Sequence, residues 1–402
     1  MSSGEGPWPL ESLGNLCRVS SGTTPSRAAG ARYFTHQGIP WVKTLDLNEG
    51  SLHATDESLT DIAVAETGAR IYPAKAVLLA MYGGWEQIGR TAILAVPAAV
   101  NQAISVLEVG PQLEPRYLLV ALQHGRSRWS RYAASTRKDP NITKSDVLAF
   151  EVPVPSLPVQ RQVVKVLDSF TKLERGIEAS IAKFEALRSG LMEELAELEC
   201  GQFGEVLKQG PQNGIYKPAS SYGLQGTPIV RIDSFSRGRS DLTRGLLRVA
   251  VSGGEIARYG LEVGDIVINR VNTPDLVGKA TSVRRLIEPT IFESNMMRCK
   301  LHHSAADPGF TETWLGSSTV KRYFLQRAKS AISQASINGD DVRDCPFPKM
   351  DVPGQLAFLK RLDAVEGQRM AEVVELAKLR QLKQGLVGDL LAGRVAVSVV
   401  AA

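Results

Sequence analysis

The stretches PVQRQVVKVLDSFTKLERGIEASIAKFEALRSGLMEEL (Pro158–Leu195) and PGQLAFLKRLDAVEGQRMAEVVELAKLRQLKQGLVGDL (Pro353–Leu390) decide the fold of this 402-residue sequence. Each begins at a proline and has no further proline, which suits a long helix with proline in its first turn. The second stretch follows the first at a constant distance of 195 residues, which already holds between Ile142 and Ile337. Matches at one distance over more than fifty positions indicate a duplicated unit.

Apolar residues recur along both stretches with alternating spacings of four and three residues, as in a coiled-coil seam. Nine of eleven such positions are apolar in the first helix, with interruptions at Glu174 and Arg188, and seven of ten in the second. We predict that the helices pack on each other; the alternative is that each lies on its own globular domain. The predicted seam and docking residues are Leu167, Phe170, Ile177, Ile181, Phe184, Leu191, Leu362, Val365, Leu376, Leu379, Leu386 and Leu390.

Each helix follows a block of short apolar runs separated by Gly and Pro, such as Ile39–Leu45 and Pro228–Ile232, which are typical of strands and turns. The predicted domains are a first block at 1–157, a spacer helix at 158–198, a second block at 199–352, and a second spacer helix with a short tail at 353–402. The fold class is α+β: two similar mixed α/β domains separated by two long helices. Because the termini of a domain often lie close together, we expect antiparallel coiled-coil helices, a pseudo-twofold repeat and a rod roughly 60 Å long.

Composition sets broad limits. Lys and Arg exceed Asp and Glu by 47 to 42, and the net charge of +5 is too small to indicate nucleic acid, although most of the surplus lies in the second block. Four widely separated Cys without a C-x-x-C pair argue against a zinc site or a disulfide framework and favour a reducing compartment. The sequence has no segment typical of a signal peptide or a membrane span, so we expect a cytoplasmic protein.

Recognisable catalytic motifs are missing from the sequence. GWEQIGRT (Gly84–Thr91) resembles a phosphate-binding loop but has Arg90 in place of its lysine, and no nuclease residues follow Pro274–Asp275. The five His form no pair with metal-ligand spacing on a helix. We therefore predict a binding protein without catalytic residues or a metal site. An enzyme with an unrecognised motif is a rival interpretation.

The order of these parts resembles the specificity subunit (S, HsdS-type) of a Type I restriction–modification system. The resemblance covers nearly the whole chain, and its most specific part is the pair of helices with their 195-residue repeat. The matching segments are Leu157–Leu195, Val352–Val397 with the ending GLVGDLLAGRV (Gly385–Val395), SGTTP (Ser21–Pro25) and IPWVKTLD (Ile39–Asp46). In the second block, QGPQNGIYKP (Gln209–Pro218) replaces the SGTTP segment.

This resemblance implies that each block is a target-recognition domain for one half of a bipartite sequence in double-stranded DNA. The helices are expected to set the gap between the halves and to dock two methyltransferase (M) subunits, which methylate adenine N6. Motor-nuclease (R) subunits add ATP-dependent cleavage for phage defence. S-adenosylmethionine, ATP and Mg are expected on these partners, with no cofactor in this chain.

DNA contacts require Lys or Arg and small donors at phosphates, and Arg, Asn, Gln or Lys at base edges. The candidates in the first block are Thr23, Thr24, Arg27, Lys43, Tyr82, Gln87, Arg90, Arg137 and Lys138, and those in the second are Lys217, Arg231, Asn269, Arg270, Asn272 and Lys279. Trp85 fits DNA, the core or a subunit contact equally well. Two rival functions are a coiled-coil scaffold for a multi-subunit complex that does not bind DNA, and a DNA reader of another phage-defence methylation system.

Overall fold

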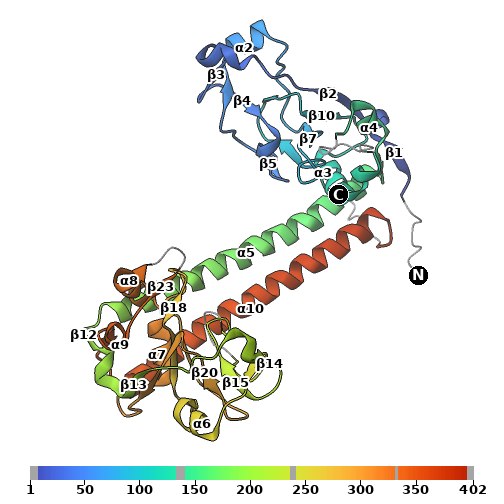
Figure 1. The fold of residues 1–402 in the computed structure, drawn as a ribbon. Coiled ribbons are helices and arrows are strands. Elements are labelled where there is room, and N and C mark those ends of the chain that lie inside the picture. The colour runs from blue at the N-terminus through green and yellow to red at the C-terminus, as the bar shows by residue number, and fades with distance from the viewer. Residues whose placement is uncertain (1–7, 133–140, 236–240, 331–333, 396–402) are drawn as a thin grey trace. The chain divides into compact units, whose positions relative to one another are not determined.

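The computed structural model describes residues 8–132, 141–235, 241–330 and 334–395. The chain forms two compact units: Met1–Glu178 with Val374–Ala402, and Ala179–Val373. The helices α5 (Leu157–Ala196) and α10 (Val352–Leu391) contain 40 residues each, and each contributes a part to both units (Figure 1). No described helix is long and apolar enough to span a membrane.

The first unit contains a domain built on two sheets that pack with short helices (Figure 1). The larger sheet has the order β2 (Cys17–Ser21), β10 (Ile104–Val109), β7 (Val77–Ala80), β8 (Thr91–Leu94) and β5 (Ser51–Leu52). The smaller sheet has the order β3 (Phe34–Thr35), β6 (Ser58–Leu59), β4 (Ile39–Val42) and β9 (Ala99–Val100). The other elements are β1 (Leu10–Ser12), which pairs with β11 (Glu151–Pro153), the helices α1 (Leu13–Leu16), α2 (Asp61–Glu66), α3 (Pro115–His124) and α4 (Lys144–Ala149), and the 3₁₀ helices η1 (Arg27–Arg32), η2 (Thr44–Asp46) and η3 (Arg126–Arg131).

The second unit contains a domain with matching sheets. Its larger sheet has the order β13 (Leu207–Asn213), β21 (Met296–Leu301), β17 (Ile266–Asn269) and β19 (Ala280–Ser282), and its smaller one β14 (Tyr222–Gly223), β16 (Arg248–Val249), β15 (Thr227–Val230) and β20 (Ile291–Phe292). The remaining strands are β12 (Cys200–Gln202), β24 (Pro346–Pro348), β18 (Val271–Asn272), β22 (Lys329–Ser330) and β23 (Ala335–Ser336). Helices α6 (Gly253–Tyr259), α7 (Pro308–Leu315), α8 (Ser318–Arg327) and α9 (Gly339–Arg343), with the 3₁₀ helices η4 (Phe203–Val206) and η5 (Ala219–Ser221), complete it.

The two domains repeat each other strand by strand. In both small sheets the third strand pairs in parallel with the fourth, β4 with β9 and β15 with β20, whereas the other pairs are antiparallel. The larger sheets share the order of their first four strands. The predicted fold class, two similar mixed α/β domains with two long helices, is therefore confirmed.

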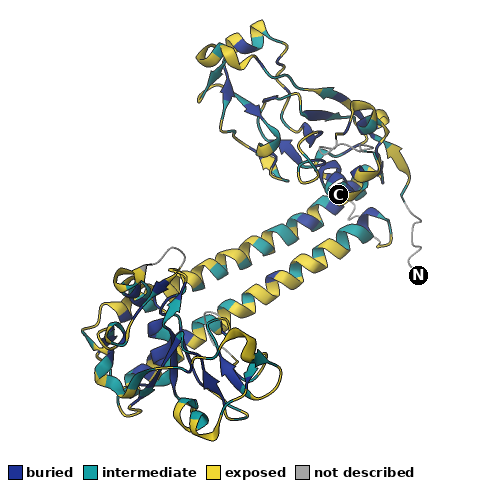
Figure 2. Cartoon of the chain, in the orientation of Figure 1, coloured by how far each residue is buried: buried dark blue, intermediate teal, exposed yellow. Residues whose placement is uncertain are grey.

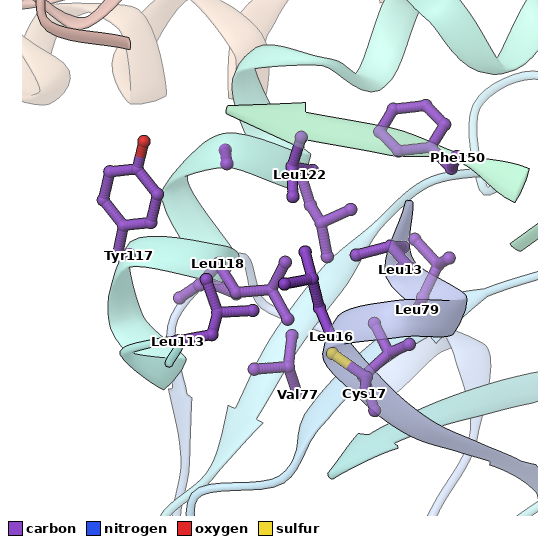
Figure 3. Close-up of a cluster of buried hydrophobic side chains, with 14 of the residues drawn as sticks. Leu13, Leu16, Cys17, Val77, Leu79, Leu113, Tyr117, Leu118, Leu122 and Phe150 are labelled. Carbon is purple, nitrogen blue, oxygen red and sulfur yellow. The ribbon is translucent and has the colours of Figure 1, made fainter. Parts of the chain in front are cut away.

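The core of each domain extends onto the ends of the long helices in the same unit. In the first unit, Val163 and Leu167 of α5 and Leu390 of α10 are buried in one apolar cluster with the domain. Figure 3 shows part of this cluster, in which Leu113, Tyr117, Leu118 and Leu122 gather with Leu13, Leu16, Cys17, Val77, Leu79 and Phe150. In the second unit, Leu195, Phe358 and Leu362 are buried with the second domain in the same way.

The helices run antiparallel within each unit, because residues further along α5 form ion pairs with residues nearer the start of α10. In the first unit, Lys383 pairs with Glu174 at 2.8 Å and Arg380 pairs with Glu178 at 2.5 Å. In the second unit, Arg188 pairs with Glu366 at 2.5 Å and Glu194 with Arg361 at 2.9 Å. All twelve predicted seam residues are buried or half-buried, and Figure 2 shows exposed residues on the remaining faces.

A left-handed turn ends α10 after Leu391. Gly393 has a φ of 69°, which a glycine adopts without a steric penalty. The amide of Gly393 donates to the carbonyl of Leu390, and the amide of Arg394 donates to that of Asp389 at 2.9 Å. This bonding pattern is a Schellman motif, and it explains why the ending GLVGDLLAGRV has a glycine at position 393.

A buried glutamine joins each domain to its long helix. The Gln160 side chain is fully buried; its oxygen accepts from the amide of Glu114 at 2.8 Å, and its nitrogen donates to the carbonyls of Gln112 and Pro155. In the second unit Gln355 does the same, accepting from Asp307 at 2.8 Å and donating to two carbonyls. The repeated Pro-x-Gln sequence therefore forms an amide clamp between the start of the helix and the loop before α3 or α7.

Replacing Gln160 with Leu is expected to lower the free energy of unfolding by about 2–4 kcal/mol, because it leaves one buried donor and two acceptors without this partner. Urea unfolding followed by tryptophan fluorescence measures the change. Gln384→Leu, at an exposed position of α10, is the control and should leave stability within about 0.5 kcal/mol. Equal effects of the two variants would contradict the clamp.

Candidate nucleic-acid interface

The small sheet of the first domain holds an arginine against two aromatic rings. Phe34 of β3 and Trp41 of β4 lie with ring centroids 5.5 Å apart. The guanidinium carbon of Arg27, the first residue of η1, is 4.3 Å from the Phe34 centroid and 4.9 Å from that of Trp41. These are distances at which a cation is attracted to a ring face, so the small sheet restrains the arginine while its side chain stays 54% exposed.

A carboxylate brings two predicted DNA-contacting cations together. Glu57 accepts from both terminal nitrogens of Arg27, at 2.5 and 3.0 Å, and from Lys43 Nζ at 3.3 Å. The hydrogen bonds from Arg27, and to a smaller extent that from Lys43, hold the pKa of Glu57 below its usual value. Both cations therefore face an ionised acid on the small sheet.

The SGTTP segment is held against the end of the same sheet. The Thr23 amide donates to the Val100 carbonyl at 2.9 Å, and the Thr23 hydroxyl donates to Gly68. A Cβ on Gly22 would lie 2.0 Å from the Val100 carbonyl oxygen, so this close approach requires glycine. Thr24 follows and is half-buried.

The remaining candidates of the first domain form a separate group around the turn at Gly83 and Gly84. Tyr82 is 38% exposed and Trp85 is 55% exposed. Arg90 donates to the carbonyl of Leu47 and to Gln87, so its guanidinium is engaged within the domain. Arg137 and Lys138 lie outside the described residues.

In the second domain, Arg231 lies at the end of β15 with its guanidinium carbon 4.9 Å from the centroid of Tyr222. Its Nε is 3.4 Å from the buried carboxylate of Glu293, and its terminal nitrogen is 3.9 Å from Asp233. Glu293 also accepts from the Ile232 amide at 2.9 Å. An arginine, a ring and a carboxylate thus meet on this small sheet as well.

Two further candidates meet at the carbonyl of Ile232. Lys279 Nζ donates to it at 3.1 Å and lies 4.5 Å from the ring centroid of Phe235, and Asn269 donates to it at 3.5 Å. Asn269 is fully buried, and its Oδ1 has no hydrogen-bond partner among the described residues. The structure therefore places Asn269 beneath the surface of the second domain.

The other candidates of the second domain are engaged locally. Arg270 donates to the carbonyl of Ser294 at 3.2 Å, and Lys217 pairs with Glu255 at 2.9 Å. Asn272 is 9% exposed and accepts from the next amide in the chain. DNA contact by any of the candidates stays a prediction. The described residues contain no group of three or more His, Cys, Asp or Glu that could hold a metal ion.

Comparison with known proteins finds a family match in the first part of the chain. Residues 5–183 match the family model of the Type I restriction modification DNA specificity domain. The resemblance indicated by the sequence is thereby confirmed.

Individual proteins are also similar to this chain, and the solved structures among them cover nearly all of it. The Type I restriction enzyme EcoR124I/EcoR124II specificity subunit of Escherichia coli is 23% identical over 186 residues, which is 46% of this chain and 46% of that subunit. The chain thus matches about half the length of this curated relative. A chain from a structure on complex assembly and conformational transition of the type I R-M system covers 98% of this chain and is fully covered itself, at a TM-score of 0.65 and 15% identity. The HsdS subunit of Thermoanaerobacter tengcongensis gives 0.57 at 15% identity, with 97% of both chains covered. At this identity the likeness to solved structures concerns the fold.

The two small sheets contain functional candidates that the sequence reasoning missed. These are the carboxylates Glu57 and Glu293 and the rings of Phe34 and Tyr222. Phe34 and Tyr222 stand 188 residues apart at equivalent places of the two small sheets, which was the available signal; the two carboxylates share no such spacing. In the QGPQNGIYKP segment, Tyr216 is 77% exposed and was also missed.

Gly214 takes the place of Gly22 in the second domain. Its amide donates to Met296, as that of Gly22 does to Ile104, and a Cβ on Gly214 would lie 2.2 Å from the Glu293 carbonyl oxygen. The QGPQNGIYKP segment therefore keeps the backbone contacts of the SGTTP segment at this glycine, although the two sequences differ.

Replacing Gly214 with Ala is expected to lower the free energy of unfolding by about 1–3 kcal/mol, because the added methyl group overlaps a backbone oxygen. The matched control is Gly223→Ala in β14 of the same small sheet, where a Cβ meets no atom within 4 Å. Urea unfolding of both variants tests the close approach. It is contradicted if Gly214→Ala is no less stable than Gly223→Ala.

Proposed function

We propose that this chain is the DNA-recognition subunit of a Type I restriction–modification enzyme. Each globular domain reads one half of a bipartite duplex target, and α5 and α10 set the gap between the halves. The observation on which this proposal rests is the duplication of a domain whose first copy matches the family model of the DNA specificity domain. The cations held on both small sheets support a nucleic-acid partner.

The proposed partners are double-stranded DNA, two methyltransferase subunits and motor-nuclease subunits. The seam helices offer the docking surface for the methyltransferase subunits. Catalysis of adenine-N6 methylation and of ATP-dependent cleavage belongs to these partners, which bind S-adenosylmethionine, ATP and Mg. This chain supplies recognition without catalytic residues of its own.

The first test compares the two domains. In a complex with the methyltransferase subunits, Lys43→Ala is expected to weaken binding through one half of the target only, and Arg231→Ala through the other half only. Each loss should reduce the slope of log affinity against log salt by about one if the cation contacts a phosphate. Binding is measured on duplexes in which one half-site at a time is scrambled.

Thermal unfolding of both variants serves as the folding control, because Glu293 is left without its arginine in Arg231→Ala. Equal loss at both half-sites would contradict the model of two readers. If the wild-type complex shows no salt-dependent binding to any duplex, the proposal fails in favour of a coiled-coil scaffold. Turnover by the purified chain alone with DNA, metal and methyl donor would instead favour the enzyme interpretation.

The second test concerns the helices. Deleting the equivalent heptads Ile177–Lys183 and Glu372–Lys378 together keeps the seam in register and removes about 10 Å of helix, or about three base pairs of duplex. The preferred gap should shorten, while the sequences of the two half-sites stay unchanged. The measurement is sequencing of methylated adenines in cells that contain the variant complex. An unchanged gap would show that the helices do not set it.

A further inference from the structure

The two small sheets arrive at one arrangement from different sequence positions. Phe34 and Tyr222 occupy equivalent places on the first strands, β3 and β14. The guanidinium over Phe34 comes from Arg27 in η1, before the ring, whereas that over Tyr222 comes from Arg231, after it. Helix η5, which stands where η1 does, contains no arginine.

The carboxylates also come from different places. Glu57 lies just before β6 of the first domain, and Glu293 lies just after β20 of the second. The residue that matches Arg231 in the first domain is Lys43, which contacts Glu57 but does not replace Arg27. Duplication alone would place the arginine and the carboxylate at equivalent positions, but they come from different positions in the two domains. A function shared by the two small sheets accounts for the common arrangement better.

The hydrogen bonds of Arg27 leave one edge of its guanidinium open. Glu57 takes the end formed by the two terminal nitrogens, at 2.5 and 3.0 Å. Nε donates to no acceptor among the described residues, and the side chain is 54% exposed. The edge formed by Nε and one terminal nitrogen therefore has a fixed orientation. Its two N–H donors lie in one plane and match a pair of acceptors in that plane.

The adjacent carboxylate determines which DNA group this edge suits. Because Glu57 neutralises the guanidinium and remains ionised, its charge opposes the approach of a phosphate anion. A base edge is uncharged, so directional hydrogen bonds decide its binding. Guanine presents O6 and N7 as a pair of acceptors in the major groove, and an arginine that donates to both is the commonest specific contact.

We propose that Arg27 recognises a guanine in the half-site of the first domain through its Nε edge, with Glu57 and Phe34 as positioning residues. This inference rests on the proposed function. Holding the guanidinium in place before binding reduces the conformational entropy lost on binding. It also makes recognition depend on the plane of the base, which a mobile lysine cannot do.

The experiment uses the full chain in complex with its methyltransferase subunits and a pool of random-sequence duplexes. The wild type is expected to select two half-sites, one of which contains a guanine whose preference Arg27→Lys reduces about tenfold. Other positions and the other half-site should stay unchanged. Glu57→Gln should weaken the preference at the same guanine without reducing the affinity for unrelated DNA.

The matched control is Arg32→Lys. Arg32 lies in the same helix η1 and also pairs with a carboxylate, but Glu66 occupies its Nε edge. This variant should leave every base preference unchanged. A second measurement needs no protein variant: 7-deazaguanine at the selected position removes N7 and should weaken wild-type binding about fivefold or more. The same base should cause no further loss in Arg27→Lys.

The inference is overturned if the wild type selects two half-sites but Arg27→Lys weakens all sequences equally, because Arg27 is then a phosphate contact. It is also overturned if 7-deazaguanine has no effect, or if Arg27→Lys lowers thermal stability without changing any preference. In these three cases the proposed function stands. Selection of no bipartite sequence by the wild type overturns both.

Discussion

The amide clamps of Gln160 and Gln355 are the interaction on which the architecture depends. Leaving a buried amide without hydrogen-bond partners costs more free energy than forming its hydrogen bonds contributes. The amide therefore favours the one geometry in which all its partners are present. Each clamp joins two backbone segments that are remote in sequence: the turn before a long helix, and the loop that leads into α3 or α7. Without it, the first turn of the helix is held to the domain mainly by apolar contacts, which tolerate rotation.

The seam adds a second constraint of the same kind. Polar residues interrupt it at equivalent places of the repeat: Thr171, Glu174 and Lys383 in the first unit, and Glu366, Arg369 and Arg188 in the second. Ion pairs that are partly exposed to solvent contribute little net stability, but a polar residue in an apolar seam excludes registers in which it has no partner. These layers therefore fix how the antiparallel helices align, while the apolar seam residues supply most of the free energy of packing.

The long helices, the repeat and the class of the domains were predictable because heptad spacing and a constant offset are properties of the chain itself. The arrangement of the small sheets was not, since Arg27 meets Glu57 only after three short strands have paired. Asn269 shows the limit most clearly. The internal repeat marked it as a DNA-contact candidate, yet neighbouring strands and the segment at Ile232 cover it. Cross-strand contacts depend on register, and a single sequence does not contain that information for strands of two to four residues.

The pairing of cations with acids gives the small net charge a physical meaning. Arg27, Lys217 and Arg231 each face a carboxylate, so their long-range attraction to phosphate is weak. A domain that bound duplex DNA mainly through unpaired cations would bind any sequence, because the phosphate backbone is the same everywhere. In the proposed DNA reader, internal neutralisation would remove much of that nonspecific free energy and leave directional hydrogen bonds to a complementary base edge. Specificity is a difference between two affinities, and the acids would increase it by lowering the nonspecific one.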